Sequence, residues 1–258
     1  MLRISTALGE VVCSKRDPFF EPHIEAVVER LTAAGKQVVR STLAMMTLDR
    51  EVAAARALAQ TGVLVEANDV ACLREVSGRP HVVGPYINVF NEGACDVLID
   101  GGAVRVLAGR AGETEMLVFG RQPLAVAMRC YHARSHGLTK DGCQFVCGLD
   151  PDGLPADTID GQALLTVNGT QTMSNGYLVL LDELGELRAM GVTHFRLSPQ
   201  DMDMVAVARI HRAVLDGQRG TAEAMTQLRQ LTGSIPWQNG FLHGREGLAW
   251  VGRADVHA

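Results

Sequence analysis

The chain has 258 residues, a net charge of −5 and a pI of about 5.9, with 47% hydrophobic and 21% charged residues. This is the composition of a globular, enzyme-sized protein, and its acidic balance without any basic run argues against nucleic-acid binding. The sequence shows no signal-peptide pattern and no apolar run near the ~20 residues of a membrane span, and its cysteines are expected to stay reduced, so we expect a cytoplasmic protein with no membrane span.

Short strand patterns alternate with helical patterns along the first hundred residues. Residues 3–8 indicate a strand, which the segment GEVVCSKR follows, and residues 22–36 have apolar side chains at helical spacing. Later segments repeat this order, with strands expected over 37–45, 63–69, 81–88 and 104–109 and helices over 48–62, 69–78 and 91–102. A strand–helix period of about 20–25 residues is typical of parallel sheets and (β/α) barrels.

The alternation then breaks. Only RAGE separates the strand over 104–109 from the next strand, over 114–120, and this is too short for a helical crossover between parallel strands. After a cysteine-rich stretch, a strand is expected over 162–169 and a helix over 177–191. The remaining expected elements are a strand over 193–199 and helices over 201–218 and 221–233.

Polar residues gather where the expected strands end. In parallel α/β folds, the carboxyl ends of the strands form the face that binds ligands. Glu66, Asn88 and Arg196 are therefore candidate substrate contacts. Arg196 could bind a carboxylate with both of its forked nitrogens, but a structural salt bridge would explain it equally well. The strand-end group comprises Glu10, Cys13, Ser41, Thr42, Glu66, Asn68, Asn88, Arg196 and Ser198.

Three of the six cysteines fall within the stretch CYHARSHGLTKDGCQFVC, residues 130–147. Cys143 and Cys147 are four residues apart, so one helical turn would place both sulfurs on the same side. Cys130 precedes a polar loop long enough to fold back on that turn. Three converging thiolates suit a soft metal ion or an iron–sulfur cluster, and Cys13 is the best candidate for a fourth ligand. Zinc is the competing ion, although the chain lacks the C-x-x-C pair common in zinc sites.

Other side chains in and around these segments have less specific interpretations. Cys72 and Cys95 lie in apolar helical patterns and are interpreted as inert core thiols. His132 and His136 are interpreted as solvated loop histidines rather than as ligands or bases. The basic residues beside the cysteines would offset the negative charge of a bound cluster: Arg129, Arg134 and Lys140.

Four segments together resemble the collagenase-like peptidase family, in particular its iron–sulfur members that act in ubiquinone biosynthesis. The similarity extends in order over nearly the whole chain. It implies a TIM-barrel-like fold and a 4Fe–4S cluster bound by Cys13, Cys130, Cys143 and Cys147. The segments are GEVVCSKR (9–16), RCYHARSHGLTKDGCQFVC (129–147), NGTQTMS (168–174) and RLSPQ (196–200).

The resemblance also implies an activity and partners. The activity is hydroxylation of the ubiquinone precursor ring without O2, with oxygen taken from another donor such as prephenate. The partners are a UbiU-like cluster protein, with which the chain would form a heterodimer, and a UbiT-like lipid carrier that presents the prenylated quinone precursor. RNA base hydroxylation and a non-catalytic electron-transfer or scaffold role are the alternatives. Neither H-E-x-x-H nor G-x-S-x-G is present, so peptidase activity is not expected.

The chain is short for a member of this family. It begins almost at the strand before CSKR, and it lacks a helix between the strands over 104–109 and 114–120. We therefore expect an incomplete (β/α) barrel-like domain over residues 1–258 with exposed strand edges. An insertion over about 127–176 would carry three of the four cluster cysteines.

Overall fold

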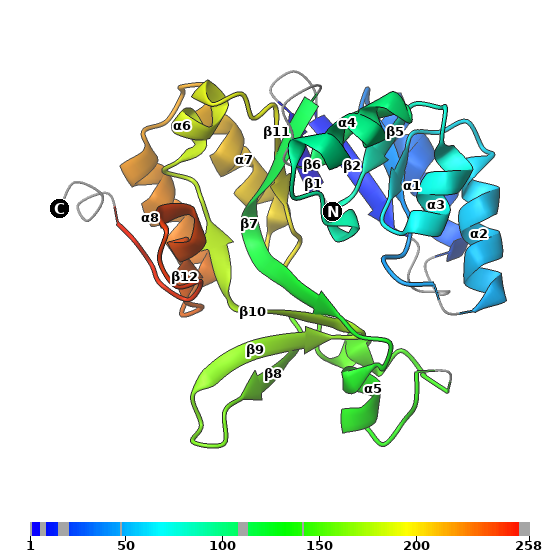
Figure 1. The fold of residues 1–258 in the computed structure, drawn as a ribbon. Coiled ribbons are helices and arrows are strands. Elements are labelled where there is room, and N and C mark those ends of the chain that lie inside the picture. The colour runs from blue at the N-terminus through cyan, green and yellow to red at the C-terminus, as the bar shows by residue number, and fades with distance from the viewer. Residues whose placement is uncertain are drawn as a thin grey trace. The chain divides into compact units, whose positions relative to one another are not determined.

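The computed structural model describes residues 2–5, 9–14, 21–46, 48–107, 113–140 and 142–252. They form a mixed α/β fold that divides into two compact units (Figure 1). The first unit comprises Met1–Met116 and Arg188–Arg196, and the second comprises Leu117–Leu187 and Leu197–Ala258.

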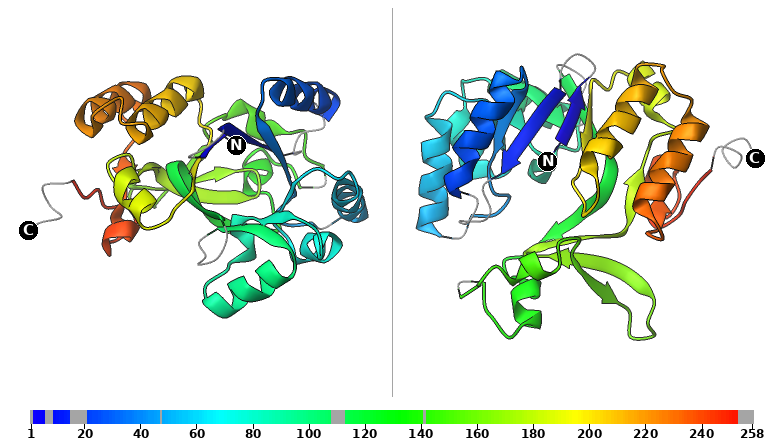
Figure 2. Two further views of the ribbon diagram at one scale, coloured as in Figure 1. Left: turned by 90° about the horizontal axis from the view of Figure 1, so that it is seen from above. Right: turned by 180° about the vertical axis from the view of Figure 1, so that it is seen from behind.

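The first unit is built on a curled sheet whose strands are mostly parallel. Strands β2 (Gly9–Ser14), β3 (Gln37–Ser41), β4 (Val65–Ala67), β5 (His81–Val83), β6 (Ala103–Leu107) and the start of β7 (Glu113–Val126) are parallel neighbours in chain order. Strand β1 (Leu2–Ser5) is antiparallel to β2. Outside the strands lie the connecting helices α1 (Glu21–Ala33), α2 (Asp49–Ala59), α3 (Val70–Val76) and α4 (Glu92–Asp100), as Figure 2 shows.

Strand β11 (His194–Leu197) curls this sheet back on itself, because it pairs with both β1 and β7. Just before it, the Thr193 amide donates to the Thr114 carbonyl at 3.0 Å, and the Thr114 amide donates to Thr193 Oγ1 at 3.1 Å. The curled α/β sheet agrees with the expected partial barrel. Since β1 and β7 both have a partner here, these two strands do not show the exposed edges that the short chain led us to expect.

Strands β6 and β7 are parallel although only residues 108–112 lie between them. Five residues are too few for a helical crossover, as expected. The two strands are nevertheless parallel, so the sheet continues without a connecting helix. Arg105 pairs with Glu113 and Leu107 with Glu115, so the strands overlap over a short length. To start β7 beside Arg105, the chain must travel back along the last three residues of β6, a distance of roughly 10 Å. An extended chain covers about 3.3 Å per residue, so a connection of five residues is long enough.

The second unit contains an antiparallel sheet and a helical pair. The continuation of β7 pairs with β10 (Gln171–Val179), which pairs with β9 (Ala163–Asn168), which pairs with β8 (Leu154–Asp157). Strand β12 (Trp237–Gln238) is parallel to the end of β10. Helix α5 (Tyr131–Ser135) packs against β9 and against the short 3-10 helix η2 (Val146–Leu149), and α7 (Met204–Leu215) packs against α8 (Thr221–Thr232).

The helix predicted over 177–191 is largely wrong. Tyr177–Val179 is the end of β10, and only α6 (Leu184–Ala189) is helical. Tyr177, Leu178 and Val179 pair with residues of β7. The hydrophobic pattern of a short apolar run does not distinguish a buried strand from a buried helix. Its secondary structure depends on whether a neighbouring strand pairs with it.

Both cysteines interpreted as core thiols are buried in the first unit. Cys72 is fully buried, and burial raises the pKa of its thiol, which keeps it protonated and unreactive. Cys95 is 3% exposed. Their neighbours are apolar: Ala59, Val65, Ala67 and Val76 around Cys72, and Val83, Ala103 and Val106 around Cys95.

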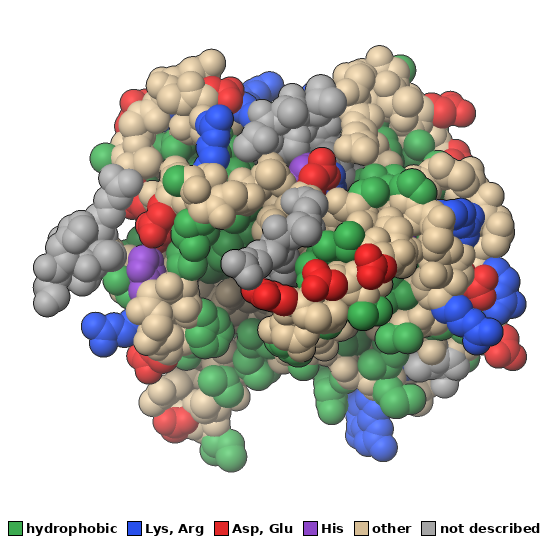
Figure 3. Space-filling view, turned by 45° about the horizontal axis from the view of Figure 1, so that its top comes forward, with side chains coloured by type: hydrophobic (Ala, Val, Ile, Leu, Met, Phe, Trp, Pro, Cys, Tyr) green, Lys and Arg blue, Asp and Glu red, His purple; other side chains and the backbone are tan. Residues whose placement is uncertain are grey.

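The surface charge and the helix lengths can be compared with the expectation of no nucleic-acid binding and no membrane span. Lys and Arg side chains stand at separate points on the face that Figure 3 presents. Within the described part of the chain, no helix combines the length and apolarity needed to cross a membrane.

Candidate functional site

Strand ends of the first unit bring together a buried polar group, which we call the Glu66 network. Glu66 of β4 accepts hydrogen bonds from Ser41 Oγ at 3.0 Å and from Asn68 Nδ2 at 3.1 Å. Arg196 of β11 forms ion pairs with Glu66 and with Glu115 of β7. Glu66, Glu115 and Arg196 are 2%, 1% and 3% exposed. Two carboxylates therefore share a guanidinium group away from solvent.

Such a network is costly to bury. Removing charges from water is repaid only when their pairing and hydrogen bonds are good, and groups of this kind occur both in functional sites and in structural ion pairs. The ion pairs of Arg196 correspond to the structural role that the sequence allowed. For Arg196 to bind a substrate carboxylate instead, Glu66 or Glu115 would have to give up its contact.

Asn68 joins this network through both its backbone and its side chain. Its amide donates to Thr42 Oγ1 at 3.0 Å, and its Nδ2 donates to Ser41 Oγ at 2.9 Å. Gly84 leaves room for it, since a Cβ at Gly84 would lie 2.0 Å from Asn68 Oδ1. This Oδ1 is buried and has no hydrogen-bond partner among the residues that the structure describes. Asn68 Oδ1 is therefore a buried acceptor without a partner among the described residues.

Asn88, the third candidate substrate contact, lies outside the network. It is exposed and adopts a left-handed conformation, with φ of 57°, directly after the 3-10 helix η1 (Pro85–Ile87). Glu115 belongs to the network but was not expected from the sequence. The available signal was the alternation of Glu113 and Glu115, which places both carboxylates on one face of β7. The strand-end residues that do come together are Ser41, Thr42, Glu66, Asn68 and Arg196.

Three cysteines that form no disulfide bond lie between the start of α5 and η2 in the second unit. Cys130 is buried and caps α5, its sulfur accepting the Ala133 amide at 3.3 Å. Cys143 is in a loop, and its sulfur accepts the Phe145 amide at 3.2 Å. Cys147 lies in η2. The predicted helical turn from Cys143 to Cys147 is wrong, because Phe145 between them is left-handed with φ of 56°.

Cysteine thiolates are the ligands that iron–sulfur clusters use, but the structure does not bring these three sulfurs into one compact group. In the described structure, the sulfurs of Cys130, Cys143 and Cys147 do not all lie within 4.8 Å of one another. Thiolates around a single zinc ion, bound at ~2.3 Å, would stand about 3.8 Å apart. In a four-iron cluster each thiolate binds a different iron, so wider spacing is natural, and amide hydrogen bonds to sulfur are a usual feature of such sites.

Cys13, the expected fourth ligand, occupies the next-to-last position of β2. Its backbone is in parallel register with Arg40 of β3. Cys13 thus lies inside a second strand, near its carboxyl end, and not in a segment that follows the strand expected over 3–8. Strand β2 belongs to the first unit, whereas the other three cysteines belong to the second.

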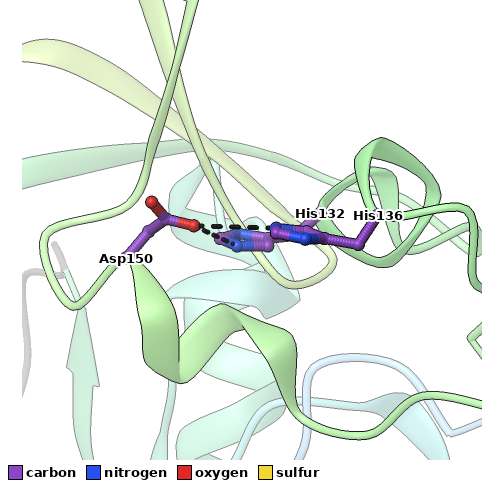
Figure 4. Close-up of side chains that lie close together, drawn as sticks. All are labelled: His132, His136 and Asp150. Atoms are coloured by element: carbon purple, nitrogen blue, oxygen red, sulfur yellow. Dashed lines mark hydrogen bonds and ion pairs between the residues drawn. The ribbon is translucent and has the colours of Figure 1, made fainter.

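His132, His136 and Asp150 converge in the second unit, as Figure 4 shows. The Nε2 atoms of His132 and His136 lie 2.8 and 3.9 Å from Asp150 Oδ2. His132 is fully buried, so its interpretation as a solvated loop histidine is wrong, whereas His136 is 36% exposed. The H-x-x-x-H spacing was visible in the sequence. The sequence did not show that His132 lies in a helix with His136 as its C-cap residue, or that Asp150 lies beside both.

Residues 102–251 match the sequence profile of peptidase family U32. The chain belongs to peptidase family U32. This confirms the resemblance to the collagenase-like peptidases at the level of the family. The matched region includes Cys130, Cys143, Cys147 and Arg196 and begins after Cys13 and Glu66. No solved structure matches the chain.

Proposed function

We propose that this U32 protein is the iron–sulfur subunit of an O2-independent hydroxylase that acts on the ubiquinone precursor ring, like the ubiquinone biosynthesis protein UbiV. The observation that carries the proposal is the 130–147 stretch. It lies within the family match, resembles that protein in spacing, and contains two cysteines, Cys130 and Cys143, whose sulfurs accept amide hydrogen bonds. The working assembly is a heterodimer with a UbiU-like subunit, supplied with prenylated substrate by a UbiT-like carrier.

The cluster would be of the 4Fe–4S type, with Cys13, Cys130, Cys143 and Cys147 as ligands. When bound it supplies one-electron chemistry, at a potential set by burial and by hydrogen bonds to sulfur. The protein contributes to that setting directly. Cys130 is buried at the cap of α5, and the Ala133 amide donates a hydrogen bond to its sulfur, which is the kind of contact that adjusts the potential of a bound cluster.

Basic side chains near these cysteines have a charge-balancing role in this proposal. Arg129 and Arg134 are exposed, and Lys140 is half-buried. Exposed guanidinium groups act on a buried thiolate through solvent-screened electrostatics. We therefore expect their individual replacement to change the cluster potential modestly and to leave the cluster in place.

Anaerobic purification with iron and sulfide analysis and an optical spectrum tests the proposal. We expect about four irons and four sulfides per chain with a broad visible band. Cys143→Ser should abolish them. Cys95→Ala is the matched control, because it removes a buried thiol that packs only in the apolar core around Val83.

The outcomes separate the candidate roles. Zinc or no metal in the wild-type chain would overturn the cluster and, with it, the hydroxylase. If the cluster is present but the purified assembly hydroxylates the precursor equally well with the Cys143→Ser chain, the chemistry resides in the partner. The chain would then be an electron-transfer or scaffold subunit.

A further inference from the structure

Three ligand-type atoms of the second unit point toward one another: His132 Nε2, His136 Nε2 and Asp150 Oδ2 (Figure 4). Two atoms that each bind a metal at ~2.0–2.2 Å can be at most about 4.3 Å apart. The nitrogen-to-oxygen separations of 2.8 and 3.9 Å meet this condition. All three atoms lie within 4.8 Å of one another, so small side-chain rotations would bring them onto one ion.

A structural hydrogen bond explains only part of this arrangement. The bond from His132 to Asp150 would by itself tie α5 to the residue that follows η2. It does not account for His136, whose ring stacks on that of His132 with an interplanar angle of 7° and a centroid distance of 5.7 Å. His136 is 36% exposed, so burial does not force its Nε2 toward the same oxygen.

We propose that His132, His136 and Asp150 bind one divalent transition-metal ion, zinc or ferrous iron, separately from the cysteines. Two imidazoles and a carboxylate are the donor set of mononuclear zinc and non-haem iron(II) sites. His132 lies in α5 and His136 is the C-cap residue of that helix, so their four-residue spacing places both imidazoles on the same side.

The site is open rather than closed. His132 is fully buried and fixes one ligand, whereas the side chains of His136 and Asp150 are 36% and 30% exposed. Two of the three donors are therefore partly accessible to solvent. Open positions are typical of sites that exchange ligands or bind substrate, and structural zinc sites lack them.

The surroundings of His132 also set the expected affinity. Metal binding at Nε2 places the ring proton on Nδ1, which is buried without a hydrogen-bond partner in the part of the chain that the structure describes. Metal-binding histidines usually donate this proton to a carboxylate or carbonyl, and loss of that partner costs about 10–100-fold in affinity. We expect binding weaker than that of a fully supported site by about this factor.

Cobalt titration of the full-length Cys143→Ser chain tests the site, because this variant removes one of the competing thiolates. Binding would be followed anaerobically by optical spectrum and by competition with a chromophoric chelator, with Co2+ alone as the probe. We expect one Co2+ per chain with no sulfur-to-cobalt charge-transfer band. Adding His136→Gln should weaken binding at least tenfold. His23→Gln, which changes an exposed histidine of α1, is the matched control and should have no effect.

Unchanged affinity after His136→Gln would overturn the proposal, as would absence of binding or a sulfur charge-transfer band in the Cys143→Ser chain. His136 is partly exposed, so its replacement is not expected to unfold α5. The result is independent of the proposed cluster. Finding no iron–sulfur cluster in the wild-type chain would leave this site standing, and failure of this site would leave the cluster standing.

Discussion

Replacing Arg196 by methionine removes the guanidinium group between Glu66 and Glu115 while keeping most of the side-chain volume. Both carboxylates are at most 2% exposed and would lose this counter-ion. Breaking a buried ion pair in this way lowers the free energy of unfolding by about 3–5 kcal/mol. At about 2–4 °C per kcal/mol for a chain of this size, the melting temperature should fall by roughly 6–20 °C.

Urea denaturation at pH 7 measures this loss. The matched control is Arg56→Met, because Arg56 pairs with Glu75 at 3.1 Å but is 60% exposed, so its removal should cost less than about 1 kcal/mol. Adding Glu66→Gln to Arg196→Met should restore part of the stability, since glutamine keeps hydrogen-bonding capacity without the charge. The reasoning is refuted if Arg196→Met stays within about 1 kcal/mol of wild type. It is also refuted if the double variant loses the sum of the two single effects.

Two further predictions concern packing and pH. Gly84→Ala should lower the free energy of unfolding by about 1–3 kcal/mol in urea denaturation, since its Cβ would meet Asn68 Oδ1 at 2.0 Å. Gly185→Ala in α6, where a Cβ meets nothing within 4 Å, should be neutral or stabilising, and equal losses in both variants would contradict the clash. Burial lowers the pKa of His211 from an ordinary 6.5 to about 4, so its contribution to stability is complete above pH 6.5 and disappears as the pH falls toward 4. Between pH 7 and pH 5 this histidine should lower the free energy of unfolding by about 2 kcal/mol, and the His211→Leu variant should not show this loss. If the free energy of unfolding has the same pH dependence in both proteins, the prediction is wrong.

Most elements between residues 20 and 102 were predictable because local signals agree there. Helices α2, α3 and α4 lie inside the expected ranges, and α1 begins one residue before its range, since each has a glycine close behind its last turn. Residues 9–14 were expected to follow a strand and instead form the strand β2. The end of β10 was not predictable in the same way. Tyr177 begins a continuous apolar run, and only its pairing with Arg121 of β7 shows that the run starts as a strand.

The Glu66 network was half predictable for a similar reason. Parallel strands place their carboxyl ends at one edge of a sheet, and this rule predicts that Ser41, Glu66 and Asn68 lie close together. Glu115 stands near the beginning of β7, so this rule does not point to it. It reaches Arg196 because β11 pairs with β7, a tertiary fact that no local pattern encodes.

Two pairs of residues in the 130–150 region have the same four-residue separation but different geometries. His132 and His136 share a helix face because the residues between them are helical. Cys143 and Cys147 have the same separation but not the same geometry, because Phe145 is left-handed. For a residue with a Cβ this conformation costs on the order of 1–3 kcal/mol and persists only where its surroundings stabilise it. The hydrogen bond from the Phe145 amide to the Cys143 sulfur is one such contact. A four-iron cluster binds each thiolate through a different iron and needs no shared helix face. The left-handed Phe145 therefore removes the argument from helical spacing that Cys143 and Cys147 place their sulfurs on the same side.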